Sequence, residues 1–250
     1  MLTPLDAEEF QSIIAHVISE LERKYQERLL YVAAKGSIAR GTETPISDID
    51  LIAVADPGGR DAYEWLYHST PVDVVVYPLE EVKERILNVD GLWPHEVGSL
   101  LVHRVYVDRG DVHQRIRGWH EEALREDWKF REACEFIGFF EYFSKVQRAV
   151  ESDSPEVLRY AAWEIFFMSC MNLALLNKRF YYDHTTMTDQ IEQFDFVPTG
   201  FLEKARDIFR RDQRRVFLGA RALFEINLRL AKEFGFERAT IADVGQIRVE

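Results

Sequence analysis

The sequence is poor in the features that mark several classes of protein. Its 250 residues include two cysteines, Cys134 and Cys170, and neither has a cysteine or histidine neighbour at the spacing of a zinc site. We therefore expect neither a disulfide scaffold nor a zinc centre, and a reducing cytoplasm is the expected location. The longest apolar stretch, residues 161–176, contains Glu164 and falls short of the ~20 apolar residues that a membrane span needs. The first residues lack the basic and apolar regions of a signal peptide.

Basic residues are fewer than acidic residues. The chain has 31 Lys and Arg against 43 Asp and Glu, which gives a formal net charge of −12. This acidity argues against a general nucleic-acid binder, because neutralising phosphates requires a basic surface. It permits a preference for a cationic small molecule, but an acidic surface also serves plain solubility, and composition leaves both interpretations open.

The pattern of apolar residues divides the chain into two halves. Up to about residue 108 the sequence predicts helices at 4–28 and 78–87, and strands at 29–34, 48–54, 63–68, 72–77 and 104–108. Beyond Gly110 it predicts only helices, at 111–150, 154–177 and 199–234. We therefore expect an α+β protein, with an N-terminal α/β domain over 1–109 followed by a helical bundle over 110–250.

Residues 35–51, KGSIARGTETPISDIDL, carry the strongest sign of chemistry. A predicted strand ends at Ala34, and Gly36 and Ser37 then turn the chain. Glycine lets the backbone approach a ligand closely, while the Ser37 hydroxyl and the nearby N–H groups can hold phosphate oxygens. Arg40 follows three residues later and can reach the same anion. This turn is a candidate phosphate-binding site.

Paired carboxylates follow the candidate phosphate site. Asp48 and Asp50 begin the next strand, and alternation along a strand directs them to the same face. Asp73 lies in the later strand VDVVVY among apolar neighbours, where an unpaired charge is costly. Hard divalent cations prefer such oxygen ligands. Three strand carboxylates beside a phosphate cradle fit a two-metal centre for phosphoryl transfer.

The order Gly36-Ser37, ten residues, Asp48-Ile49-Asp50 and then Asp73 resembles the signature of the DNA polymerase β-like nucleotidyltransferase superfamily. Within it, GSIARGTETPISDIDL is most similar to the kanamycin nucleotidyltransferases. The chain departs from those antibiotic-modifying relatives at positions 50 and 73, which carry Asp where they carry Glu. Asp at both positions is the triad of the broader superfamily, so the metal site is better defined than the acceptor.

The resemblance implies a polymerase β-like catalytic domain, a helical domain for substrate binding and dimerisation, and a role for each matching residue. Asp48 and Asp50 would bind two Mg²⁺ ions, and Asp73 would complete the site of the metal that activates the acceptor. Glu141 matches the general base that takes the proton of the acceptor hydroxyl. The residues implied in nucleotide binding are Gly36, Ser37, Arg40, Ser47 and Lys145.

The residues themselves give a plainer interpretation of Glu141 and Lys145. They stand four apart on a predicted helix, and an ordinary surface ion pair has the same spacing. Farther along, Arg179 and His184 have the Arg-x4-His spacing of HEPN ribonucleases, but Phe180 stands where those enzymes usually carry a polar residue. Short motifs of this kind recur by chance.

These observations predict a magnesium-dependent enzyme that transfers a nucleoside monophosphate from a nucleoside triphosphate, ATP above all, to a hydroxyl group. The resemblance favours a small cationic acceptor such as an aminoglycoside, as in antibiotic resistance, and a homodimer. Two alternatives stay open. One is a toxin–antitoxin type nucleotidyltransferase that modifies a protein or tRNA, and the other is a nucleotide-binding regulator that has lost catalysis.

Overall fold

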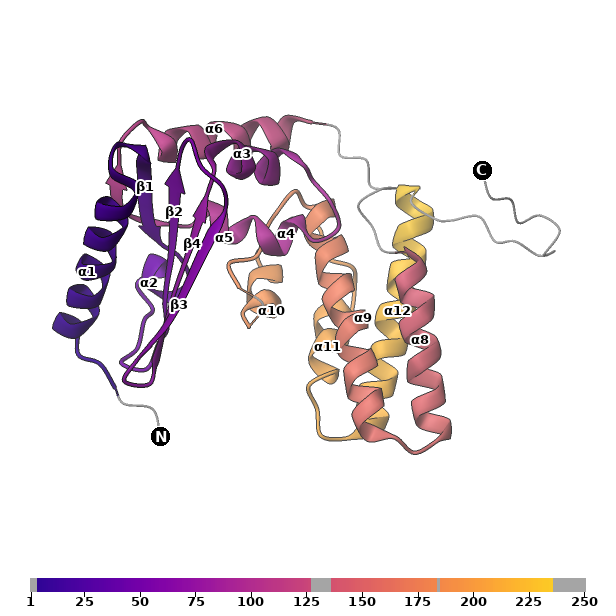
Figure 1. The fold of residues 1–250 in the computed structure, drawn as a ribbon. Coiled ribbons are helices and arrows are strands. Elements are labelled where there is room, and N and C mark those ends of the chain that lie inside the picture. Colours follow the sequence, from indigo (N-terminus) through magenta and orange to yellow (C-terminus); the bar gives the residue numbers. More distant parts are fainter. Residues whose placement is uncertain (1–3, 127–135, 184, 236–250) are drawn as a thin grey trace. The chain divides into compact units, whose positions relative to one another are not determined.

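The computed structural model describes residues 4–126, 136–183 and 185–235 (Figure 1). It divides the chain into two compact units. The sheet unit comprises residues 1–89, 93–127 and 180–184, and the helical unit comprises residues 90–92, 128–179 and 185–250.

A five-stranded sheet forms the centre of the sheet unit, with the strand order β3-β4-β2-β1-β5. The strands are β1 (Leu29–Ala34), β2 (Ile49–Ala55), β3 (Asp61–Tyr67), β4 (Thr70–Tyr77) and β5 (Arg104–Asp108). β2 and β4 run parallel, and the other neighbouring pairs are antiparallel. The five strands predicted from short β-rich runs are all present, with small shifts at their ends.

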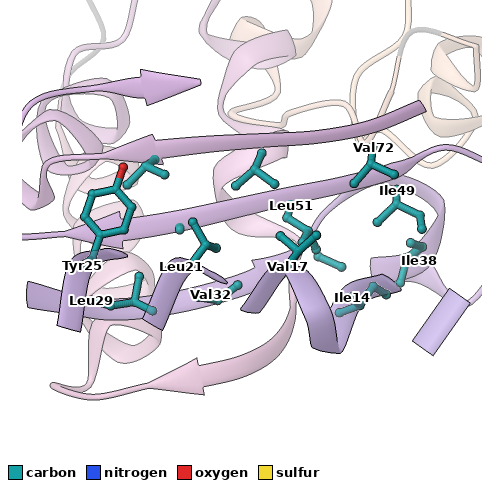
Figure 2. Packing of buried hydrophobic residues seen from close by; sticks show 14 of the residues in the cluster. Ile14, Val17, Leu21, Tyr25, Leu29, Val32, Ile38, Ile49, Leu51 and Val72 are labelled. Carbon is teal, nitrogen blue, oxygen red and sulfur yellow. The ribbon is translucent and has the colours of Figure 1, made fainter. Parts of the chain in front are cut away.

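Helix α1 (Ala7–Tyr25) covers one face of this sheet. It begins at Asp6, whose carboxylate accepts hydrogen bonds from the backbone of Glu8 and Glu9, while Glu9 bonds back to the Asp6 N–H. Its apolar side packs on every second residue of β2 and β4, and on residues of β1, where the register shifts between Leu29 and Tyr31 (Figure 2). The strand residues buried in this contact are Leu29, Val32, Ala34, Ile49, Leu51, Ala53, Ala55, Val72, Val74 and Val76. In β2 and β4 the residues between them point to the opposite face.

Short helices complete the sheet unit. They are α2 (Gly36–Arg40), α3 (Leu79–Leu87), α4 (Trp93–Glu96), α5 (Gly98–Leu101) and α6 (Val112–Arg125). α6 lies beyond the boundary that the sequence placed at 109/110, yet it belongs to the sheet unit. Its Val112 and Ile116 are buried, and it contacts α3, β1 and β5. The change to an all-helical pattern at residue 110 therefore does not coincide with the division between the compact units.

The helical unit contains α8 (Phe136–Glu151), α9 (Pro155–Leu176), α10 (Met187–Ile191), α11 (Phe201–Asp207) and α12 (Gln213–Phe234). Pro155 occupies the first turn of α9, as predicted. The single helix predicted over 199–234 is wrong. The structure breaks it between α11 and α12, where Asp212 has an extended backbone and its carboxylate accepts the Arg214 N–H. No helix in the described part of the chain is long and apolar enough to cross a membrane.

Candidate active site

Sheet register brings two of the predicted carboxylates together. Asp50 on β2 and Asp73 on β4 are direct partners in the parallel pairing. Both neighbours of Asp73, Val72 and Val74, pack on the α1 side of the sheet, as does Leu51 beside Asp50. Asp50 and Asp73 therefore share the opposite face. Neither is fully buried, so both remain within reach of a ligand.

The same register reveals a carboxylate that the sequence analysis missed. Glu64 on the edge strand β3 is the antiparallel partner of Asp73. Glu64, Asp73 and Asp50 consequently form a row across three adjacent strands, which we call the carboxylate row. Glu64 could not be found from the sequence because it follows no motif. Its place in the row depends on the pairing of β3 with β4.

The glycine turn lies directly beside this row. Gly36 has a φ of +64°, in the left-handed region, and a Cβ at this position would lie 3.3 Å from Asp50 Oδ2. The Lys35 N–H also donates to the Asp50 carbonyl oxygen, at 2.9 Å. Glycine at position 36 thus permits both the backbone conformation and the close approach of α2 to Asp50. The structure therefore places the glycine turn next to Asp50.

The electrostatics of Asp50 reflect this crowding. Burial is the main cause of its raised pKa, and the charges of Asp48 and Asp73 raise the pKa further, while the Lys35 cation lowers it. Asp48 lies just before β2 and is exposed. Lys35 was not singled out from the sequence, because a lone lysine before a glycine turn is no signal by itself. Three carboxylates with one nearby lysine leave an excess of negative charge.

The donor set of the three aspartates fits a hard divalent cation. Carboxylate oxygens are the ligands that Mg²⁺ prefers, and a bound cation would relieve the repulsion that raises the pKa of Asp50. As the side chains stand, no group of three or more His, Cys, Asp or Glu among the described residues is arranged to hold a metal ion. The fit therefore rests on the chemistry and the proximity of the donors.

The predicted phosphate ligands have distinct surroundings. The Ser37 hydroxyl is buried and finds no hydrogen-bond partner in the described part of the chain. A buried hydroxyl without a partner is costly, and a ligand oxygen would satisfy it. Arg40 forms an ion pair with Asp183, with 2.9 Å between Nη2 and Oδ2. Ser47 is engaged within its own loop, where its hydroxyl accepts the Thr44 N–H at 2.9 Å.

Glu141 and Lys145 belong to the helical unit. They form the i,i+4 ion pair on α8, with 2.7 Å between Oε1 and Nζ. The Glu141 side chain is 61% exposed, and the Lys145 ammonium also lies over the Tyr142 ring, 4.3 Å from its centre. The plain surface pairing expected from the spacing is thus present, and the catalytic role of Glu141 stays a prediction.

The HEPN interpretation falls partly outside the described residues, since His184 is not among them. Arg179 lies 3.6 Å from the carboxylate of Asp195, in an exposed ion pair. Arg179 belongs to the helical unit, whereas the four residues between Arg179 and His184 belong to the sheet unit.

Comparison with known families decides the identity of the fold. Residues 14–152, more than half of the chain, match the nucleotidyltransferase domain family. This chain is a nucleotidyltransferase. Residues 121–225 match the KNTase C-terminal domain, the C-terminal domain of kanamycin nucleotidyltransferase. The predicted superfamily and the kanamycin nucleotidyltransferase-like type of enzyme are thereby confirmed, as is the order of an α/β domain before a helical region.

Among solved structures, the nucleotidyltransferase is similar to a nucleotidyltransferase-like protein from Exiguobacterium sibiricum 255-15. The two sequences are 12% identical, the similarity covers 89% of this chain and 78% of the other, and the TM-score is 0.45. No curated protein matches the chain.

Proposed function

We propose that this nucleotidyltransferase is a magnesium-dependent, cytoplasmic homodimer that transfers AMP from ATP to a hydroxyl of a small cationic acceptor such as an aminoglycoside. The observation that carries the proposal is the carboxylate row beside the Gly36-Ser37 turn. The turn offers groups for phosphate, and the row offers oxygen ligands for metal.

In the proposed reaction the acceptor oxygen attacks the α-phosphorus of ATP. A new P–O bond forms to the acceptor, the bond to the β-phosphate oxygen breaks, and pyrophosphate leaves with its electron pair. Asp48, Asp50 and Asp73 would hold the metal ions, which lower the pKa of the acceptor hydroxyl and neutralise charge on the leaving group.

Other residues would bind the nucleotide and move the proton. Ser37 and Arg40 would bind the triphosphate, with Ser47 nearby, and Lys145 would contact the nucleotide phosphates. Gly36 admits the ligand because it carries no side chain. Glu141 would accept the acceptor proton, and its exposed carboxylate is free to rearrange from the Lys145 pair.

The charge of the site supports a cationic acceptor. Glu64 extends the row beyond the aspartates that would bind metal, so one carboxylate is left to attract an ammonium group. The net charge of −12 acts in the same direction and disfavours a tRNA acceptor. Substituting Glu64 by Gln should therefore raise the KM for a cationic acceptor several-fold and leave the KM for ATP unchanged.

Incubation of the pure protein with magnesium, ATP and an aminoglycoside panel, followed by mass spectrometry, tests the proposal. We expect an acceptor to gain the mass of AMP, and the gain to vanish in Asp50→Asn. Labelled ATP added to a cell lysate separates the alternatives. Label in protein or tRNA would favour a toxin–antitoxin enzyme, and ATP binding without pyrophosphate release would favour a regulator.

A further inference from the structure

A short segment from the C-terminal half of the sequence completes the sheet unit. Residues 180–183 follow α9 in the chain, yet they belong to the sheet unit and not to the helical unit. The segment ends at Asp183, which pairs with the predicted triphosphate ligand Arg40. We propose that Asp183 is a positioning residue for nucleotide binding, which holds the Arg40 guanidinium in the orientation that receives the triphosphate. This inference rests on the proposed function, in which Arg40 binds the triphosphate.

Residues 180 and 181 make close contacts with other parts of the sheet unit. The Tyr181 side chain is fully buried, and the Tyr181 N–H donates to the Pro94 carbonyl oxygen at 2.7 Å. A Cβ on Gly98 would lie 2.0 Å from the Tyr181 carbonyl oxygen, so only glycine allows the two backbones to approach this closely. The Phe180 ring meets the His120 ring edge-on, with 5.6 Å between centres. Asp183 therefore extends from a fixed anchor two residues away.

The ion pair is suited to orienting Arg40. The Arg40 and Asp183 side chains are only 23% and 25% exposed, so solvent screens the pair less than a surface pair. A free arginine loses much rotamer freedom when it binds a ligand, and a partner that already restrains it reduces that loss. Arg40 Nη2 lies 2.9 Å from Asp183 Oδ2. The guanidinium has five N–H donors, so others remain for phosphate oxygens.

The anchored backbone also argues against an inhibitory role, in which Asp183 would occupy Arg40 only until ATP binds. A carboxylate that blocked Arg40 until ATP arrived would have to move away when the triphosphate bound. The backbone that carries Asp183 is anchored two residues away, by the fully buried Tyr181 and its close contact with Gly98, so the segment as a whole is not expected to withdraw. We therefore expect Asp183 to stay beside Arg40 when the nucleotide is bound.

Binding of α,β-methylene-ATP with magnesium, measured by calorimetry, tests the role without catalysis, because this analogue cannot lose pyrophosphate. We expect Asp183→Ala to weaken binding about five-fold, and Asp183→Asn, which keeps an oxygen acceptor, to weaken it less. In an Arg40→Ala background, Asp183→Ala should have no further effect. Asp195→Ala is the matched control, since it removes an exposed carboxylate that pairs with Arg179 instead.

Two results would overturn the role of Asp183. Tighter binding in Asp183→Ala would show that the carboxylate competes with the triphosphate. An equal loss with and without Arg40 would show that Asp183 only supports the fold, and thermal unfolding of each variant provides the same check. The AMP-transfer assay is read separately. Binding that depends on the pair in a protein that transfers no AMP would support the inference while the proposed function fails.

Discussion

The two units bury different kinds of polar group. In the sheet unit, groups that titrate lie wholly or partly out of solvent, among them Asp50, His103 and Tyr31. In the helical unit, the fully buried polar side chains of the described core are Ser169, Asn172 and Asn227, which carry no charge at any ordinary pH, while the partly buried Asp207 is paired with Lys204 and Arg215. The comparison suggests that the sheet unit is built to hold charge for chemistry, and that the polar core of the helical unit serves its own packing.

The polar chain of the helical unit is closely bonded. The Asn227 amide donates to Ser169 Oγ at 2.7 Å and to the Leu223 carbonyl at 2.8 Å, and it accepts from Asn172 at 3.3 Å. The buried Tyr31 hydroxyl of the sheet unit instead contacts two histidines. It lies 2.8 Å from His103 Nδ1 and 3.4 Å from His113 Nδ1.

The tautomer of His103 follows from its partners. Its Nε2 lies 2.9 Å from the Ser99 carbonyl oxygen, which can only accept, so Nε2 carries the proton. In the neutral ring Nδ1 then accepts from the Tyr31 hydroxyl. Protonating Nδ1 would reverse this hydrogen bond and place a positive charge on a largely buried ring, which burial disfavours.

The largest effect should come from the carboxylate row. Asp50→Asn should lower the rate of the proposed AMP transfer about a thousandfold, since one carboxylate would be lost from the proposed metal site. Glu141→Gln should lower it about a hundredfold, the range of a general base. Steady-state kinetics on both variants, with the exposed Asp153→Asn as control, would sharpen the comparison between the units. If Glu141→Gln were as active as wild type, Glu141 would not be the general base.

The second prediction concerns pH. Burial lowers the pKa of His103 from 6.5 to about 4. Between pH 6.5 and pH 4 the unfolded chain binds a proton at His103 that the folded chain does not bind. The free energy of unfolding is therefore undiminished by this group above pH 6.5 and decreases as the pH drops toward 4. The loss from this group should reach about 3 kcal/mol.

Urea unfolding of wild type and His103→Gln from pH 7.5 to 4.5 isolates the contribution of His103, because the other titrating groups are common to both proteins. His16→Gln, at an exposed position, is the control for replacing a histidine by glutamine. Parallel curves for wild type and His103→Gln would contradict the assignment.

The third prediction concerns the helical unit. Asn227→Ala should cost about 2 kcal/mol of unfolding free energy, because it leaves the buried Asn172 amide without its partner. None of the three hydrogen-bonded side chains, Ser169, Asn172 and Asn227, titrates between pH 5 and pH 7.5, so the cost should be the same at both pH values. A cost that changed strongly with pH would break the distinction between the two units.

The smallest effect should come from the exposed pair on α8. Glu141→Gln should change the free energy of unfolding by less than about 0.5 kcal/mol, because its partner Lys145 lies on a solvated helix face. Thermal unfolding measures this directly. A large destabilisation would mean that any loss of activity in this variant reports on folding instead of catalysis.

The sequence predicted the five strands well, because short β-rich runs and turn signals are local. It also predicted the neighbourhood of Gly36 and Asp50, since one strand and one short helix connect them. It missed Glu64 because strand pairing determines that position. It missed Asp183 because the partner, Arg40, is far away in the sequence, and no local pattern records such a contact.

The docked segment at residues 180–183 has a consequence for synthesis. A ribosome makes the chain from the N-terminus, so β1 to β5 and α6 emerge long before Tyr181 does. Until then, the surface beside Pro94 and Gly98 lacks the residue that fills it in the folded protein. The sheet unit of the nascent chain can be completed only after α8 and α9, which precede Tyr181 in the sequence, have been synthesised. A truncated gene ending after α6 would for the same reason yield an incomplete catalytic unit, even though every strand is encoded.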